Sequence, residues 1–373
     1  MVEWKEISSL GDYFGGLTGK TKKDFENGNA KFITYMNVFS NPSLDVNTVG
    51  MVHINEGERQ NKVQKGDILF SGSSETPDEA GMSCVVTDDL DGDYYINSFC
   101  FGLRLNNPEQ YNLHFFKHVL RSYSIRQAIS KTASGVTRFN ISKARFGKVK
   151  IPIPSLSEQS RIVGILDTFA DSIENLKKQI AQRRKQYEHY RDQLLDLEGK
   201  EGVEMKRIED FSKVLRGKRL TKKELDDNAQ YPVYHGGIEP LGRYCRYNRA
   251  ANTVMVINVG ASAGTVGFCD SYFWSSDGCF CISHSELINN KYLFYYLETK
   301  THYLQSQVRH AGIPTLDNAV VEKIQIPLLS LEKQQRIVSI LDTFEASISN
   351  LEAQLAQRQK QYEYYRNQLL TFE

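Results

Sequence analysis

The sequence has no long apolar run and no secretion signal. None of its 373 residues lies in an apolar stretch of 18 or more, so we expect no membrane-spanning segment. The first residues, MVEWKEISSL, lack the basic start and apolar core of a signal peptide. Its hydrophobic content is 40% and its charged content is 24%, which is typical of a soluble globular chain. We therefore expect a cytoplasmic protein.

The cysteines and histidines lack the spacings of metal or redox sites. The six cysteines include no CxxC pair, and the eight histidines include no HExxH motif. Cys279 and Cys281 are two residues apart in an apolar segment, which favours a core strand over a ligand pair. We therefore expect reduced, mostly buried thiols and no metal site in this chain.

Phosphate-binding and catalytic motifs are also missing. The segment Gly15–Thr21 looks briefly like a P-loop, but the spacing requires a glycine where Phe14 stands. No other set of residues suggests a nucleophile with its base. No catalytic constellation therefore emerges from the sequence. The net charge of +1 argues against a chain that grips nucleic acid tightly unaided.

A strict apolar repeat is present twice. Steps of four and three residues give a 3.5-residue period, which is typical of a coiled-coil seam. The first copy contains Ile162, Leu166, Phe169, Ile173, Leu176, Ile180, Tyr187 and Leu194. The second, 175 residues later, contains Ile337, Leu341, Phe344, Ile348, Leu351, Leu355, Tyr362 and Leu369.

The two repeats are copies of each other. The segments RIV, ILDTF, AQR and KQYE recur in both, and each seam is interrupted once, by Arg183 and by Arg358. This identity indicates duplication. We expect the two helices to pair as an antiparallel coiled coil. The alternative is two amphipathic helices that each dock on their own domain.

The duplication predicts four parts and an α+β fold. These are a first globular domain at 1–152, a helical region at 153–200, a second globular domain at 203–325 and a helical region at 326–373. In the first domain we expect strands at Lys31–Val38, Asp67–Ser71, Ser83–Thr87 and Tyr94–Leu105, a helix at Leu113–Ile129 and a strand at Lys148–Ile153. Ser155 and Glu158 have capping-box spacing, so the first long helix should begin there.

Basic residues recur at corresponding places in the two globular domains. Such clusters suit contact with DNA phosphates, and arginines among aromatic residues suit contact with base edges. The alternative is an ordinary solvated surface. The candidates for DNA binding are Lys20, Lys22, Lys23, Gly135, Thr137, Arg138, Arg216, Lys218, Arg219, Lys222, Lys223, Arg243, Arg246, Tyr247 and Arg249.

Over its full length the chain resembles the specificity subunits of type I restriction–modification systems. The resemblance is carried by Ser134–Arg138 and by the junction Ile151–Val163, where the first domain gives way to the helix. The strand Gly66–Phe70 is also similar. The second copy departs from the pattern: Gly312–Thr315 has no arginine, and Lys333 stands where Glu158 was.

The resemblance implies a fold and a function. The fold is two target-recognition domains with pseudo-two-fold symmetry, separated by two long helices. Each domain reads one half of a bipartite site in double-stranded DNA. The implied partners are two methyltransferase subunits and, in the full complex, restriction subunits. S-adenosylmethionine, ATP and Mg²⁺ are expected on those partners, and the resemblance implies that this chain has no catalytic activity and no cofactor of its own. On this interpretation the seam, about 53 Å long, sets the separation of the two half-sites. A different kind of function, a coiled-coil scaffold whose globular ends bind proteins, is the alternative.

Overall fold

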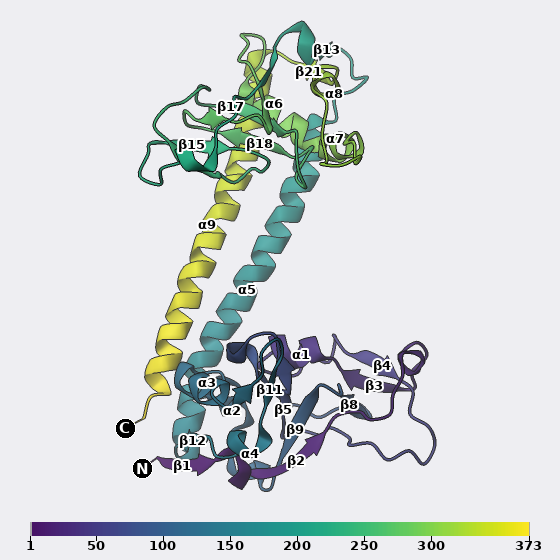
Figure 1. The fold of residues 1–373 in the computed structure, drawn as a ribbon, viewed down its shortest axis with the longest axis vertical. Helices are drawn as coiled ribbons and strands as arrows, with labels where there is room; N and C mark the ends of the chain where they lie inside the picture. The colour runs from purple at the N-terminus through teal and green to yellow at the C-terminus, as the bar shows by residue number, and fades with distance from the viewer. Residues whose placement is uncertain (1, 373) are drawn as a thin grey trace. The chain divides into compact units, whose positions relative to one another are not determined.

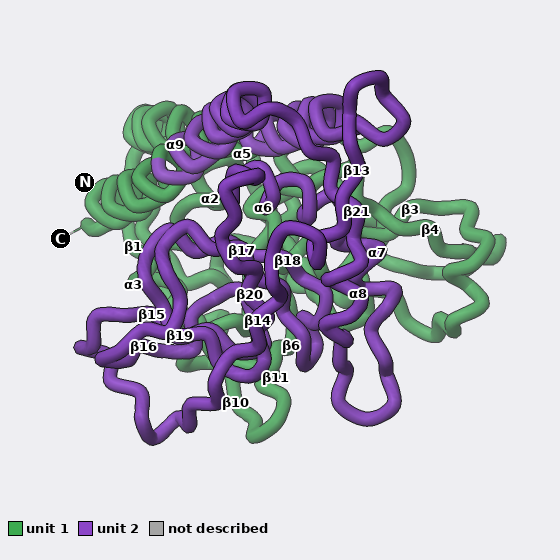
Figure 2. Tube along the Cα trace, turned by 90° about the horizontal axis from the view of Figure 1, so that it is seen from above, with its two compact units in different colours: residues 1–177, 354–373 green, residues 178–353 purple. Residues whose placement is uncertain are grey.

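The computed structural model describes residues 2–372 and contains two compact units. Unit 1 comprises the chain up to Lys177 together with the segment from Gln354 on, and unit 2 is Lys178–Ala353 (Figure 2). Each long helix therefore contributes one part to each unit. No helix within residues 2–372 is both long and apolar enough to cross a membrane.

Unit 1 contains a mixed α+β domain (Figure 1). Its strands are β1 Glu3–Glu6, β2 Gly11–Gly15, β3 Ala30–Ile33, β4 Gly50–Val52, β5 Asp67–Ser71, β6 Ser73–Ser74, β7 Ser83–Val85, β8 Tyr94–Ile96, β9 Cys100–Leu105, β10 Ala133–Ser134, β11 Phe139–Ile141 and β12 Lys150–Ile153. Its short helices are α1 Tyr35–Ser40, α2 Leu113–Val119, α3 Tyr123–Ser130 and α4 Lys143–Phe146.

The strands of unit 1 form four small sheets. An antiparallel sheet in the order β2-β9-β5-β7 is the centre, and a second sheet, β4-β3-β8, contains the parallel pair β3–β8. Strand β1 pairs with β12, and β10-β11-β6 form a small sheet that carries a hairpin. The central sheet buries Phe70 and Phe101 against Phe146 of α4, with ring centroids 4.9 and 5.5 Å from that of Phe146.

Unit 2 repeats three of these four sheets. Its strands are β13 Glu204–Arg207, β14 Val214–Arg216, β15 Tyr231–Tyr234, β16 Gly242–Tyr244, β17 Thr253–Ile257, β18 Val266–Cys269, β19 Trp274–Ser275, β20 Cys279–Ile282 and β21 Gln325–Leu328. Its short helices are α6 Asn290–Thr299, α7 Thr301–Ser306 and α8 Asn318–Glu322. The sheet β14-β20-β17-β18 corresponds to β2-β9-β5-β7, β16-β15-β19 to β4-β3-β8, and β13-β21 to β1-β12. The parallel pair recurs too, as β15–β19.

Two long helices complete the units: α5 is Leu156–Leu195 and α9 is Leu331–Leu369. Within unit 1, Phe169 of α5 stacks on Tyr365 of α9 with ring centroids 5.2 Å apart, and Ile162 lies in one core with Leu370. From Ile162 to Phe169 the residue number rises along α5, while the number of the contacting residue falls along α9 from Leu370 to Tyr365. The two segments therefore run antiparallel. Within unit 2, Tyr190 stacks on Phe344 with ring centroids 5.4 Å apart, and Arg184 bonds to Glu352, so these segments also run antiparallel.

All the predicted seam residues are buried or half-buried. Ile162, Leu166 and Leu341 lie in the domain cores, whereas the middle of the seam, including Leu176 and Leu351, is half-buried. The two alternatives for the helices are therefore both partly realised: the ends dock on the globular domains, and within each unit α5 also packs on α9.

Three predicted elements of the first domain were wrong in extent. The strand predicted at Lys31–Val38 ends at Ile33, because the Thr34 hydroxyl accepts a hydrogen bond from the Asn37 amide and starts α1. The strand predicted at Tyr94–Leu105 is broken at residues 97–99, where the Asn97 side chain accepts a bond from the Phe99 amide. The helix predicted at Leu113–Ile129 is split into α2 and α3.

The predicted burial of the cysteines is confirmed, because five of the six are buried and only Cys245 is exposed. Cys279 and Cys281 lie in the core beside Met255 and Phe273.

Candidate DNA interface

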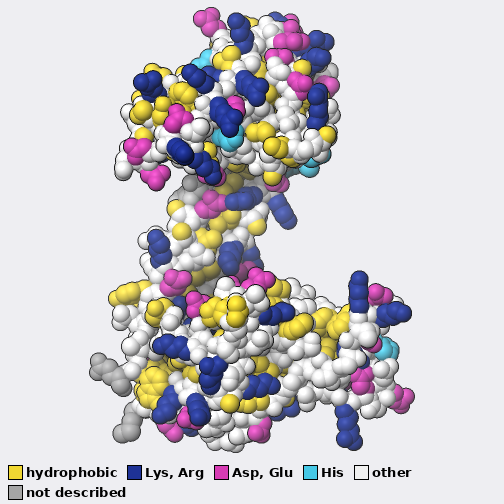
Figure 3. All heavy atoms as spheres, viewed as in Figure 1, with side chains coloured by type: hydrophobic (Ala, Val, Ile, Leu, Met, Phe, Trp, Pro, Cys, Tyr) yellow, Lys and Arg dark blue, Asp and Glu magenta, His cyan; other side chains and the backbone are white. Residues whose placement is uncertain are grey.

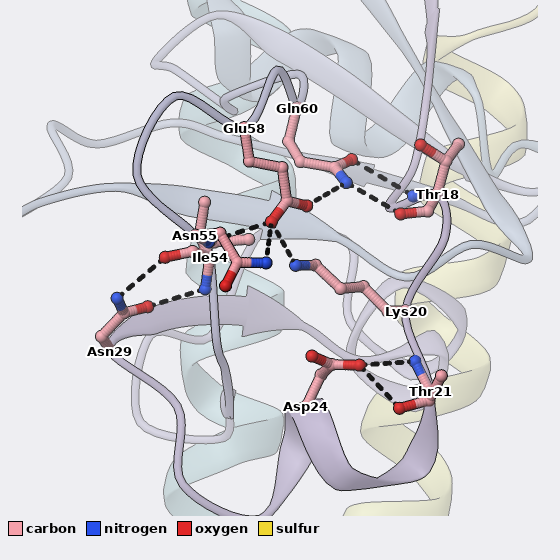
Figure 4. Close-up of polar contacts among 9 residues, drawn as sticks. All are labelled: Thr18, Lys20, Thr21, Asp24, Asn29, Ile54, Asn55, Glu58 and Gln60. Carbon is pink, nitrogen blue, oxygen red and sulfur yellow. Dashed lines mark hydrogen bonds and ion pairs between the residues drawn. The ribbon is translucent and has the colours of Figure 1, made fainter.

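A Thr-Lys-Lys-acid turn follows the second strand of each domain. Thr21 and Asp24 form a capping box, in which one Asp24 oxygen accepts bonds from the Thr21 amide at 2.7 Å and hydroxyl at 2.8 Å (Figure 4). Thr221 and Glu224 repeat it at 2.8 and 2.7 Å. These bonds lower the pKa of both carboxyl groups, with the bond from the threonine amide as the first cause.

The capped turn holds two lysines in the same local frame in each domain. They are Lys22 and Lys23 in unit 1, and Lys222 and Lys223 in unit 2, and all four are exposed. The recurring lysine pairs are thus part of a repeated structural element. The number of charges alone would not distinguish such an element from an ordinary solvent-exposed stretch of lysines.

Lys20 lies beside this turn but has an internal partner that the sequence did not predict. Its ammonium is 2.6 Å from the Glu58 carboxylate, and the Lys20 side chain is only 6% exposed. Glu58 also accepts bonds from Asn55 and Gln60, and Gln60 in turn bonds to the backbone of Thr18 (Figure 4). The Lys20 bond is the first cause that lowers the Glu58 pKa to about 2. The pair fastens loop 55–60 to loop 18–21.

The hairpin between β10 and β11 carries the predicted cluster Gly135, Thr137 and Arg138. A side chain at Gly135 would meet the Arg138 carbonyl oxygen at 1.8 Å, so the loop closes on itself only with glycine there. Thr137 and Arg138 are exposed, and the Arg138 guanidinium lies 5.1 Å from the ring centre of Phe99. Phe99 is itself 53% exposed, which makes this an accessible arginine–aromatic pair.

In unit 2 some of the predicted arginines hold loops in place through hydrogen bonds, and others lie exposed on the surface. Arg249 is half-buried and donates to the backbone carbonyl of Arg216 at 2.8 Å, so these two candidates lie together. Arg243 donates to the carbonyls of Ala229 and Gln230. Both guanidinium groups therefore fasten loops as well as carrying charge.

The other candidates in unit 2 are exposed, namely Arg216, Lys218, Arg219, Arg246 and Tyr247. Tyr247 packs edge-on against Tyr231, with centroids 5.0 Å apart. Arg246 has no hydrogen bond or ion pair to any other part of residues 2–372. Lys and Arg side chains are interspersed with Asp and Glu over the visible faces of both units (Figure 3).

The sequence analysis missed a buried glutamine that joins each domain to its helix. Gln159 of α5 accepts a bond from the Asn112 amide at 2.9 Å and donates to the Pro154 carbonyl at 2.9 Å. Gln334 of α9 does the same with the Asn289 amide, at 2.7 Å, and the Leu329 carbonyl, at 2.9 Å. Both glutamines are almost fully buried. Their shared position in the two copies was the available signal.

A polar junction in unit 1 connects the domain to both long helices. The buried His118 of α2 lies 2.6 Å from Asp167 of α5 and 3.0 Å from the hydroxyl of Tyr362 of α9. Burial lowers the His118 pKa. Because a carboxylate can only accept, the Nε2–H of His118 donates to Asp167. In unit 2 the corresponding bond is from the Tyr295 hydroxyl to Asp342, at 2.6 Å.

Within residues 2–372, no group of three His, Cys, Asp or Glu side chains lies close enough together to hold a metal ion.

Comparison with known proteins gives one consistent match. The family model described as the type I restriction modification DNA specificity domain matches residues 1–183 and again 200–359. A putative type I restriction enzyme specificity subunit of Haemophilus influenzae is 28% identical over 296 residues, which cover 72% of this chain and 74% of that protein. A putative type I specificity subunit of Mycoplasma pneumoniae is 27% identical over 62% of this chain and 90% of its own length.

Solved structures share the fold. The type I restriction–modification S subunit from M. genitalium matches with a TM-score of 0.65 at 18% identity, over 100% of this chain and 97% of that one. A chain from a study of complex assembly and conformational transition of the type I R-M system matches with a TM-score of 0.63 at 17% identity, over 99% and 97%.

Proposed function

Because the chain belongs to the type I restriction–modification DNA specificity family, we propose that it is the DNA-recognition subunit of such a system and reads a bipartite target with one domain per half-site. It directs adenine methylation and DNA cleavage by its partner subunits and has no catalytic activity itself. The partners are double-stranded DNA, two methyltransferase subunits and the restriction subunits. S-adenosylmethionine, ATP and Mg²⁺ bind to those subunits and not to this chain.

The observation that carries the proposal is the repetition of one domain with different surfaces. The three sheets of unit 2 match three of the four sheets of unit 1 in strand order, while the loops between them scarcely share residues beyond the Thr-Lys-Lys turn. A repeated scaffold with divergent loops suits two readers of unlike sequences. A catalytic pair would instead repeat its polar residues.

The charge pattern supports a division of labour with partner subunits. The chain has 46 Lys and Arg against 45 Asp and Glu, and a protein with almost no net charge is only weakly attracted to the DNA phosphates as a whole. If the methyltransferase subunits supply most of the phosphate contacts, the specificity subunit has only to position itself and read base edges.

The test is methylation by the assembled complex. The chain is produced with its methyltransferase partner, and methylated adenines are mapped on genomic DNA by long-read sequencing. We expect one asymmetric, two-part motif. A protein-binding scaffold would give no sequence-specific methylation, and that outcome would reject the proposal.

An exchange of one domain sharpens this test. Replacing residues 203–325 with the second domain of another family member should change one half of the motif and leave the other half as it was. Replacing residues 1–152 should do the converse. A motif that changes in both halves after either exchange would contradict one domain per half-site.

A further inference from the structure

Two aliphatic side chains stand out for their exposure. Val136 is 91% exposed and Ile313 is 70% exposed, the highest values among the large hydrophobic residues in the described chain. At such exposure these side chains contribute almost no hydrophobic stabilisation to the fold. Isolated exposed aliphatics are common on protein surfaces, so their position has to decide whether these two matter.

Their positions correspond in the two domains. Val136 is at the tip of the hairpin between α3 and α4, and Ile313 is at the tip of the hairpin between α7 and α8. The offset between them is 177 residues, the same as between the helix-capping residues Asn112 and Asn289. One exposed β-branched residue at a hairpin tip could be accidental, but the same feature in both copies of a duplicated domain indicates a shared role.

Each tip is held outward by its backbone. In unit 1 the strand pair Ala133–Ser134 and Asn140–Ile141 is fastened to β6, and the close approach at Gly135 turns the chain back. In unit 2, Arg309 and Thr315 exchange backbone hydrogen bonds of 2.9 and 3.1 Å. Gly312 supplies a positive φ of 91° at that tip.

The surroundings of both tips are basic. The segment 131–138 contains Lys131 and Arg138 and no acidic residue, and the segment 309–315 contains Arg309 and no acidic residue. In unit 2 a groove of about 560 Å³ is lined by Ile313, Arg216, Arg309 and Asp317, and the Arg309 guanidinium is paired with the Asp317 carboxylate at 3.2 Å. The arginine missing after Gly312 in the second copy therefore has its counterpart in the exposed Arg216 of β14.

Aliphatic tips beside arginines match the chemistry of a DNA groove. Arginine binds phosphates and the acceptor edge of guanine, whereas an aliphatic group packs against a thymine methyl or between base steps. A protein partner would bury apolar residues in larger contiguous patches. Here each tip offers one aliphatic side chain flanked by cations.

We propose that Val136 and Ile313 are base-contact residues, one for each half-site, with the two hairpin tips entering the DNA. This inference rests on the proposed function and adds to it the residues that discriminate bases. Arg138 in unit 1, and Arg216 in unit 2, lie beside the tips and bind phosphate or guanine.

The test uses the complex of the full chain with its methyltransferase subunit and the variants Val136→Ser and Ile313→Ser. Initial methylation rates are measured on the mapped target and on duplexes with single substitutions in each half-site. Val136→Ser should lower the rate on the intact target about tenfold, as expected from the loss of a buried aliphatic contact. It should also weaken discrimination in the half-site read by the first domain and leave the other half-site unaffected. Ile313→Ser should give the mirror result.

Two matched controls come from exposed hydrophobic residues outside the hairpins. Met36 in unit 1 is 60% exposed and Leu287 in unit 2 is 50% exposed, and their replacement by serine should leave both half-sites unchanged. Thermal unfolding should be unaffected by the tip variants because their side chains are already in solvent.

Three outcomes decide the matter. Half-site-specific loss supports the proposal. Rates and discrimination equal to wild type in both tip variants would overturn it, and so would failure of the variants to co-purify with the methyltransferase subunit, which would make the tips a protein interface. If the wild-type complex shows no sequence-specific methylation, the proposed function itself fails, a result that is separate from these.

Discussion

Single residues of one type serve different purposes within a few positions of each other. Lys20 points inward to Glu58, while Lys22 and Lys23 are exposed on a capped turn. The sequence shows three lysines within four residues and gives no sign that their environments differ. The difference arises from Glu58, 38 residues away, which reaches Lys20 only when loop 55–60 is folded against loop 18–21.

Replacing Glu58 by glutamine should lower the thermal stability of unit 1 at neutral pH. The Glu58 pKa in the folded chain is about 2, below its ordinary value of 4.5. The ionised group therefore stabilises the fold fully above about pH 4.5, and this contribution is lost as the pH falls toward 2. Melting temperatures of wild type and Glu58→Gln should differ at pH 7 and converge on acidification. Glu56→Gln, at an exposed neighbour, is the control; an equal effect there would count against the Lys20–Glu58 pair.

At the scale of elements, the junction between domain and helix depends on one buried amide in each copy. Gln159 accepts a bond from the backbone amide of Asn112, which caps α2, and Gln334 accepts one from the amide of Asn289, which caps α6. This bond fixes the direction in which each long helix leaves its domain.

Leucine at either glutamine position should cost about 1–3 kcal/mol of unfolding free energy, because a buried backbone amide loses its partner. Gln159→Leu should destabilise unit 1 and Gln334→Leu unit 2, which local hydrogen exchange can distinguish. Gln193→Leu changes an exposed residue of α5 in unit 2 and serves as the matched control. Unchanged amide exchange at Asn112 in Gln159→Leu would refute the role of the bond.

The seam of the long helices should respond unevenly to truncation. Leu166→Ala and Leu341→Ala remove fully buried side chains and should each cost about 2–5 kcal/mol. Leu176→Ala and Leu351→Ala lie where the seam is half-buried and should each cost about 1–2 kcal/mol. Chemical denaturation of the four variants tests the order. Equal losses of unfolding free energy at all four sites would show that burial does not determine how much each seam residue contributes to stability.

At the scale of the whole molecule, the helices belong to both units. The C-terminal segment from Gln354 packs with the first domain, and residues from Lys178 to the end of α5 pack with the second. Neither globular domain is therefore closed by its own stretch of chain alone. Because each long helix contributes a part to both units, a change in its length involves both domains.

Inserting one heptad into α5 near Lys177 and another into α9 near Ala353 should widen the unread spacer of the DNA motif. Seven residues keep the 3.5-residue register and lengthen a helix by about 10.5 Å, which corresponds to about 3 base pairs. Motif mapping should return both half-sites unchanged. Insertions of three residues break the register and should give a less stable protein. A spacer that stays constant after the heptad insertions would contradict a ruler function for the helices.

Local and periodic features were predictable from sequence. The duplication, the two long helices, the start of α5 after Ser155 and the core position of Cys279 and Cys281 follow from spacing and residue type, because nearest neighbours along the chain determine them. Where short-range signals competed, prediction failed: Thr34 starts a helix inside an expected strand, and Asn97 breaks another.

The amino-acid sequence by itself determined that this protein is a duplicated chain of globular and helical parts with basic loops at matching positions. Only the tertiary structure decided which of those basic groups are held internally, which residues close each domain onto the helices, and which aliphatic side chains stand at the hairpin tips. These properties depend on contacts between residues far apart in the chain, such as Lys20 with Glu58 and His118 with Tyr362. Composition and spacing do not encode such contacts, because exposure is set by what the folded chain places around a side chain.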